Sequence, residues 1–202
     1  MALGLDFAAK ARILDFVKPL SVGLDGMTEF GFVERRLRIS EILLEGEEGK
    51  ESAVGAVGAL PARLFLLTAF AGLPSARRIT RDSREDLLLR SLHIPFEEIS
   101  SLVTSLGRVA SDPQTREERI VHDAMLLESV GAYGVTQLLV AGVRERMTLG
   151  EMAREIAEKM AAARFATEAG RRLAADRIAF AALFARKLAE EAVEFENAKP
   201  SG

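Results

Sequence analysis

The residues best suited to chemistry in this 202-residue chain are a few histidines and aspartates. His122 and Asp123 are adjacent, and they lie in a run, residues 120–127, in which every other residue is apolar. The second of the two histidines is His93, and there is no cysteine, which excludes thiolate ligands and cysteine nucleophiles. Imidazole and carboxylate groups bind divalent metals such as Mn, Mg, Fe or Ni. One hypothesis is therefore a metal site formed by His93, His122, Asp123 and Asp176.

The other interpretation of these two histidines is structural. His93 directly precedes Ile94-Pro95, and a residue close before proline is biased away from helix, so we expect a turn there rather than a ligand-bearing helix. His122 is then a partly buried polar side chain beside the core.

Asp123 is expected to be buried. Its helix opens with a capping box, in which Thr115 is followed three residues later by Glu118. Ile120 and Leu127 lie three residues before and four residues after Asp123, so the three side chains share one face of the helix. A buried carboxylate needs a metal, a protein cation or backbone donors to offset the loss of water.

The positioning elements are predicted to be helices throughout. Apolar residues recur with helical spacing, and no alternation of strand type has useful length. Pro19 is expected to end the first helix, and Thr28 to cap the second. Thr148 with Glu151 is expected to form a further capping box, and residues 51–59 are only weakly predicted to be helical. The helices are expected at residues 5–17, 28–44, 62–72, 83–92, 96–110, from Thr115 into the stretch ending at 142, 148–163 and 167–196. The fold class is all-α, as a single domain over 1–202 with a frayed tail at 197–202.

Composition limits the range of functions. The net charge of −3 comes from 27 basic and 30 acidic residues, so we expect no nucleic-acid partner. No apolar run is long enough to span a membrane, and no signal-peptide pattern opens the chain, so we expect no membrane partner and a cytoplasmic location. The basic segment with Arg77, Arg78 and Arg81 is either a solvated loop or a site for an anion or acidic partner.

In this order, the segments resemble small single-domain bacterial-type members of the HD-domain phosphohydrolase superfamily, over about residues 23–194. The most specific matches are IVHDAMLLESVGAYGV, which is similar to the segment carrying the family's last aspartate, and FATEAGRRLAADRIAFAALFARKLAEE, which is similar to the closing helix. Moderate matches are GLDGMTEFGFVERRLRIS, LFLLTAFAGLP and LHIPFEEISSLVTSL. The resemblance implies a helical bundle of the HD type.

The resemblance also implies where a metal site would stand. The family binds a divalent cation through one early histidine, an adjacent His-Asp pair and a distant aspartate, and the cation activates a water that attacks a phosphate ester. In this chain Phe32 stands at the first histidine and Thr68-Ala69 at the pair, to within one residue. Asp123 alone matches a ligand position. Arg35 matches the arginine three residues after the first histidine, and it is the cation that we expect to pair with Asp123.

We therefore expect a degenerate HD-like domain without metal-dependent phosphohydrolase activity and without a cofactor. It would act as a binding or scaffolding module for a protein or a nucleotide-like small molecule, and a homodimer is a further candidate. One alternative is an active metal-dependent phosphohydrolase with a relocated site at His122 and Asp123. Another is a purely structural helical subunit. We also expect Phe32, Thr68 and Asp123 to meet in space, with Phe32 filling the volume of the missing metal.

Overall fold

The computed structural model describes residues 4–21, 31–48, 60–73 and 79–197, without the side chains of Phe32 and residues 194–197. Helices account for 79% of the described residues, and no strand occurs among them, so the all-α prediction is confirmed. The helices are α1 (Phe7–Ser21), α2 (Gly31–Glu47), α3 (Ala62–Phe70), α4 (Arg84–Ser91), α5 (Phe96–Arg108), α6 (Arg116–Ser129), α7 (Gly131–Arg144), α8 (Leu149–Ala162) and α9 (Glu168–Asn197).

Most predicted helices match these bounds, and the exceptions are local. Pro19 was expected to end the first helix but lies inside the last turn of α1, which continues to Ser21. A proline so near the end of a helix removes a single backbone hydrogen bond, so the turn survives it. The cap expected at Thr28 and the weak helix prediction for residues 51–59 fall on residues outside the described part of the chain.

The chain divides into two compact units, and whether they form one domain stays a prediction. The first unit comprises Met1–Met125 and Ala166–Gly170, and the second comprises Leu126–Phe165 and Arg171–Gly202. The helices α6 and α9 each contribute residues to both units.

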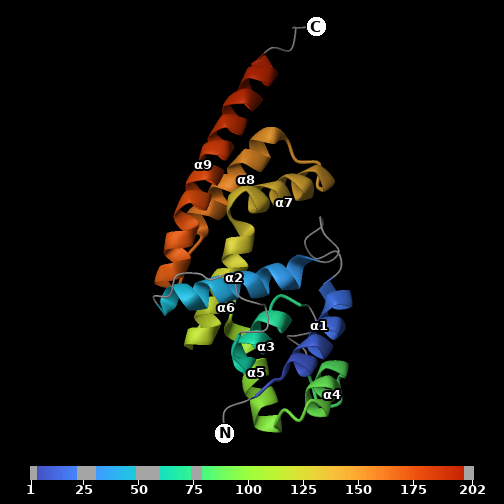
Figure 1. Cartoon of the computed structure of the whole chain (residues 1–202). Coiled ribbons are helices and arrows are strands. Elements are labelled where there is room, and N and C mark those ends of the chain that lie inside the picture. Colours follow the sequence, from blue (N-terminus) through green and yellow to red (C-terminus); the bar gives the residue numbers. More distant parts are fainter. Residues whose placement is uncertain (1–3, 22–30, 49–59, 74–78, 198–202) are drawn as a thin grey trace. The chain divides into compact units, whose positions relative to one another are not determined.

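The first unit is built around α3. This helix packs against α1, α2 and α5, and α4 packs on α5 (Figure 1). Every side chain from Leu64 to Phe70 is buried, as the almost wholly apolar sequence of α3 predicts. Burial of large side chains such as Phe65 and Phe70 contributes roughly 1.5–3 kcal/mol each. The core therefore fixes α2 and α3, the helices that carry Phe32, Thr68 and Ala69.

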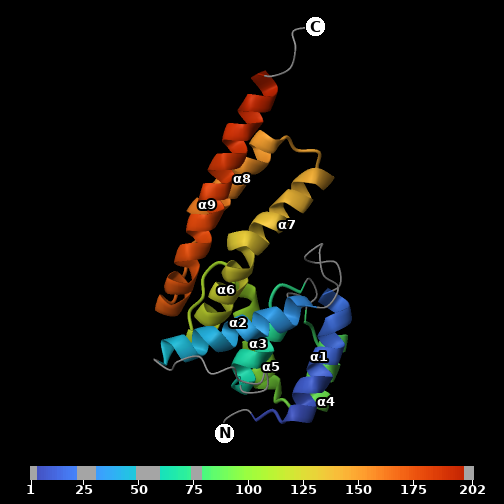
Figure 2. The same ribbon diagram turned by 45° about the horizontal axis from the view of Figure 1, so that its top comes forward.

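The second unit consists of α7, α8 and most of α9. Figure 2 shows α8 and α9 running side by side, and α7 packs against α8. The capping box predicted from Thr148 and Glu151 opens α8, since each residue bonds the other's backbone N–H. Gly142 of α7 lets Met152 approach, because a Cβ at Gly142 would lie 2.8 Å from the Met152 Cγ. The small residue therefore sets the spacing of α7 and α8.

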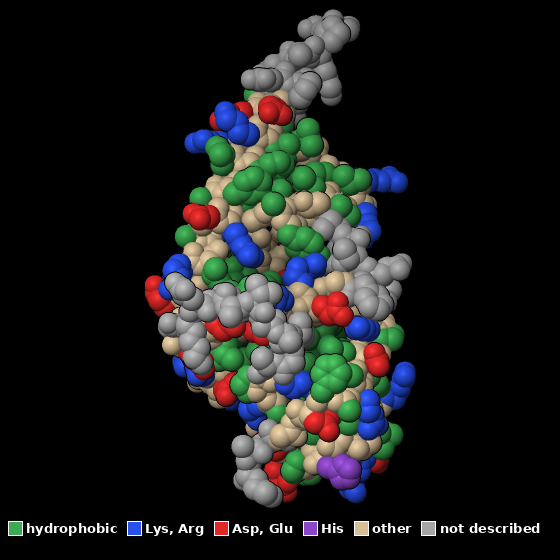
Figure 3. Space-filling model, viewed as in Figure 1, with side chains coloured by type: hydrophobic (Ala, Val, Ile, Leu, Met, Phe, Trp, Pro, Cys, Tyr) green, Lys and Arg blue, Asp and Glu red, His purple; other side chains and the backbone are tan. Residues whose placement is uncertain are grey.

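Among the described residues, no single helix is both long and apolar enough to cross a membrane. On the face shown in Figure 3, lysine and arginine side chains alternate with aspartate and glutamate rather than gathering by sign.

Candidate functional site

The candidate site centres on Asp123 in α6. Its side chain is completely buried, as are Ile120 and Leu127 on the same side of the helix to within 1% exposure. The capping box that opens α6 is also as predicted: the Glu118 N–H donates to Thr115 Oγ1 over 3.2 Å, and the Thr115 N–H donates to Glu118 Oε2 over 3.1 Å. The burial of this carboxylate, which the sequence predicted, is therefore confirmed.

Both oxygens of Asp123 accept hydrogen bonds from the segment that leads into α9. The Ala166 N–H donates to Oδ1 over 2.8 Å. The Thr167 N–H and the Thr167 hydroxyl donate to Oδ2 over 2.8 Å and 2.6 Å. Bonds of neutral donors to a carboxylate are stronger than neutral pairs. Asp123 therefore joins α6 to the start of α9.

Gly170 makes this contact sterically possible. A Cβ at Gly170 would lie 2.2 Å from Asp123 Oδ2 and 2.9 Å from Thr167 Oγ1, closer than real Cβ atoms approach. A glycine is needed here for space.

The N-terminus of α9 is capped by three side chains. Thr167 precedes the first helical residue, and its Oγ1 accepts the Gly170 N–H over 2.9 Å, the usual bond of an N-cap. Glu47, at the end of α2, accepts the Ala169 N–H at Oε1 over 3.0 Å. With Asp123, this places two carboxylates at the positive end of the α9 dipole, where negative charge is favourable.

Arg35 was expected to pair with Asp123, and this pairing stays a prediction. The recorded donors to Asp123 are Ala166 and Thr167, so backbone amides and a hydroxyl stabilise the charge. The neighbouring Arg36 is 3% exposed and donates from Nη1 to the carbonyl of Ala71 at the end of α3. These donors lie 43 and 44 residues after Asp123 in the sequence, so helix spacing could not reveal them.

Thr68 and Ala69 are both completely buried in α3. Thr68 Oγ1 donates to the Leu64 carbonyl over 2.8 Å and lies 3.2 Å from the Ser40 hydroxyl of α2. The side chain of Phe32 lies outside the description. The recorded partners of Thr68 and Asp123 differ, and the expected meeting of Phe32, Thr68 and Asp123 stays a prediction.

The alternative metal set is not assembled among the described residues. His122 Nδ1 lies 2.9 Å from the Val109 carbonyl. His93 is exposed, with φ of 60°, in the turn between α4 and α5 that Ile94-Pro95 predicted. Asp176 is exposed on α9. Within the part of the chain that is described, no three histidine, aspartate or glutamate side chains form a group suited to a metal ion.

Glu118 carries a second role that its capping position did not reveal. Its completely buried carboxylate receives Arg108 Nε over 2.9 Å and Arg108 Nη2 over 2.6 Å, and the Gln114 N–H over 2.7 Å. Burial raises the pKa of Glu118, but the hydrogen bonds from Arg108, Ser105, Gln114 and Thr115 outweigh it and lower the pKa to about 2. The charged form of Glu118 thus fixes the connection between α5 and α6.

Comparisons with known proteins locate the fold. No protein-family model and no curated protein matches the sequence. A solved structure from Lactobacillus plantarum is similar, with a TM-score of 0.65 and 15% identity, over 95% of this chain and 100% of that chain. Bacillus subtilis YpgQ in complex with ADP is similar with a TM-score of 0.60 and 15% identity, over 90% of this chain and 97% of its own.

The likeness is one of fold. A further crystal structure of Bacillus subtilis YpgQ is similar with a TM-score of 0.56 and 13% identity, over 90% of this chain and 96% of that chain. At these identities the helices share an arrangement, while the side chains at the candidate site must be judged on their own contacts.

Proposed function

We propose that this chain is an HD-like helical module that lacks metal-dependent phosphohydrolase activity and acts by binding or scaffolding. In this proposal Asp123, the one residue that matches a family ligand position, has a structural role. The cytoplasmic location expected from the sequence is part of the same proposal.

The observation that carries the proposal is the set of bonds made by Asp123. Its Oδ1 and Oδ2 accept three hydrogen bonds from residues 166–167, and Gly170 lies against Oδ2. A carboxylate that binds a metal must direct an oxygen lone pair to the ion, together with further ligands. At the two other ligand positions with described side chains, Thr68 and Ala69 supply a back-bonded hydroxyl and a methyl group. Neither replaces an imidazole or a carboxylate.

A nucleotide-like small molecule is the first ligand to test. The observation that favours it is a neighbour in fold, YpgQ, whose solved structure is described as a complex with ADP. A protein partner or a second copy of this chain is the alternative binding partner of the same module.

The competing proposal is a working phosphohydrolase with a relocated site at His122 and Asp123. Three of the roughly four acceptor sites of the Asp123 carboxylate already receive hydrogen bonds from Ala166 and Thr167. The carboxylate would have to bind a cation at the remaining site, or give up one of these bonds and leave its donor without this acceptor. A purely structural subunit is the third candidate, and it predicts no ligand of any kind.

The full chain, purified without chelator, separates these proposals. Metal content is measured by mass spectrometry, and phosphatase activity is screened with Mn, Mg, Ni and Co. If the chain is a binding module, its metal content should be well below one equivalent per chain, and the phosphatase substrates should be hydrolysed no faster than in buffer alone. Stoichiometric metal with turnover would overturn it. Calorimetric titration with ADP then separates a binding module from a purely structural subunit, because only the former gives a saturable signal with this ligand or with another partner.

A further inference from the structure

The first unit contains a cavity that no part of the Asp123 site uses. Its volume is about 610 Å³, within the range of small-molecule sites. It lies between α4, α5 and the segment 79–81. The residues that line it are Ile79, Thr80, Arg81, Asp86, Arg90, Phe96, Ile99, Ser100, Val103 and Thr104.

One wall of the cavity is apolar. Phe96, Ile99 and Val103 follow one another at intervals of three and four residues, so they share one face of α5. Phe96 is 64% exposed, although it opens a helix whose other large apolar side chains are mostly buried. An exposed aromatic ring beside a concave apolar wall offers surface that a planar ligand can cover.

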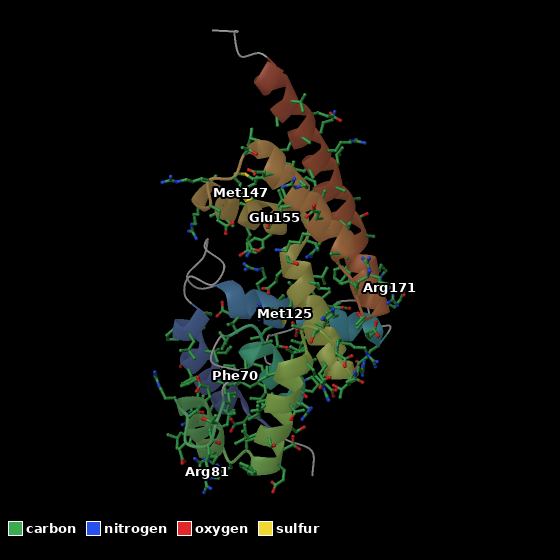
Figure 4. All side chains as sticks on the ribbon, turned by 180° about the vertical axis from the view of Figure 1, so that it is seen from behind. Phe70, Arg81, Met125, Met147, Glu155 and Arg171 are labelled. Carbon is green, nitrogen blue, oxygen red and sulfur yellow. The ribbon has the colours of Figure 1, made fainter. Side chains whose placement is uncertain are left out.

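The opposite edge of the cavity carries two arginines in different situations. Arg90 is paired, since its Nη2 lies 2.6 Å from Asp82 Oδ1 and 2.7 Å from Asp86 Oδ2. Arg81 is exposed and forms no ion pair or hydrogen bond with any residue that the structure describes. Figure 4 shows the Arg81 side chain beside α4. Because Arg90 is held between Asp82 and Asp86, Arg81 is the cation on this lining whose guanidinium is open to a ligand's negative charge.

We propose that this cavity binds a small organic anion with a planar apolar ring, the ring against Phe96, Ile99 and Val103 and the acidic group at Arg81. The Ser100 and Thr104 side chains lie on the same lining and supply neutral polar groups. A guanidinium binds carboxylate, phosphate or sulfonate through paired N–H donors, which fixes the orientation of such a ligand. The proposal does not depend on whether the chain hydrolyses phosphate.

Two matched fluorescent probes test this proposal on the full chain. The first is 8-anilinonaphthalene-1-sulfonate, and the second is N-phenyl-1-naphthylamine, which has the same rings without the sulfonate. Wild type is expected to bind the sulfonate at one saturable site and more tightly than the amine. Arg81→Gln should weaken sulfonate binding about tenfold, the effect of one lost charged contact, and leave amine binding unchanged. Phe96→Ala should weaken both probes.

The controls carry the same changes elsewhere on the surface. Phe7 is 83% exposed on α1, and Arg119 is exposed on α6, so Phe7→Ala and Arg119→Gln should leave both affinities as in wild type. Melting temperatures verify that each variant is folded. If Phe96→Ala were unstable, the affinities of the two probes for Arg81→Gln would still test the proposal. Equal loss of both probes in Arg81→Gln, no loss in that variant, or the same loss in Arg119→Gln would each overturn the proposal.

Discussion

The Oδ2 atom of Asp123 accepts two hydrogen bonds from Thr167, one from its N–H over 2.8 Å and one from its hydroxyl over 2.6 Å. The same hydroxyl accepts the Gly170 N–H over 2.9 Å. Thr167 is thus both the N-cap of α9 and a hydrogen-bond donor to the buried Asp123 carboxylate. The residue that the sequence marks for chemistry is bound into a helix cap, and the first three predictions concern this cap and the second buried carboxylate.

Replacing Thr167 should distinguish the stabilising contribution of its hydroxyl from that of its backbone N–H. Thr167→Ala removes the N-cap and one donor to Asp123, and it should lower the free energy of unfolding by about 1–2 kcal/mol. Thr167→Ser keeps the hydroxyl and should restore most of that loss. Urea unfolding of the three proteins measures both effects. If serine were as destabilising as alanine, the hydroxyl would not be the group that matters.

Gly170→Ala tests the close approach of α9 to Asp123. The new Cβ would lie 2.2 Å from Asp123 Oδ2, so the carboxylate or the helix must move, at about 1–3 kcal/mol in the free energy of unfolding. Gly107→Ala in α5 is the matched control, because no atom lies within 4 Å of its added Cβ. The control should be neutral or stabilising by up to about 1 kcal/mol. Similar effects at both positions would show that helix propensity, rather than the contact, is measured.

Glu118 should make stability depend on pH under acidic conditions. Its pKa is lowered to about 2 from the ordinary value of 4.5, so the unfolded chain takes up this proton first as acid is added. The contribution of the charged form is complete above about pH 4.5 and is lost as the pH falls toward 2.

Thermal melting between pH 6 and pH 2 measures this dependence. Glu118→Gln should lower the melting temperature at pH 6. It should also reduce the decrease in melting temperature between pH 6 and pH 2. Glu117→Gln changes the same charge in the same turn and should leave the slope close to that of wild type. A slope that Glu118→Gln leaves intact would remove Glu118 as its source.

The sequence predicted local features of the fold well. The capping boxes at Thr115 and Thr148, the buried helix α3 and the burial of Asp123 all follow from spacing within a few residues. These features depend on local hydrogen bonds and on one apolar face, both of which a single segment encodes.

The partners of the buried groups were not predictable in the same way. Asp123 bonds to residues 43 and 44 positions later, and Glu47 bonds to Ala169, 122 positions later. Such pairs depend on where the packed core places the start of α9. Gly170 offered a signal in retrospect, since a glycine three residues after a capping threonine fits close contact with another group. Arg35 was chosen by analogy with a family position, and that analogy named a cation but none of the donors at residues 166 and 167.

The sequence also pointed to only one part of the cavity beside Arg81, its basic edge. The sequence offered Arg77, Arg78 and Arg81 together as either a solvated loop or a site for an anion or acidic partner, and it did not single out Arg81. The apolar wall that makes the site amphipathic comes from α5, and its placement beside residues 79–81 depends on the packing of α4 on α5.

The central claim, that Asp123 holds a helix cap rather than a metal, is tested most directly by melting wild type and Asp123→Asn, each with and without chelator. An asparagine offers one acceptor oxygen and turns an NH₂ group toward the donors of either Ala166 or Thr167, so the variant should lose about 1–3 kcal/mol. The account predicts that chelator changes neither melting temperature. A wild type that loses stability in chelator, beside a variant that is indifferent to it, would contradict the account and make Asp123 a metal ligand.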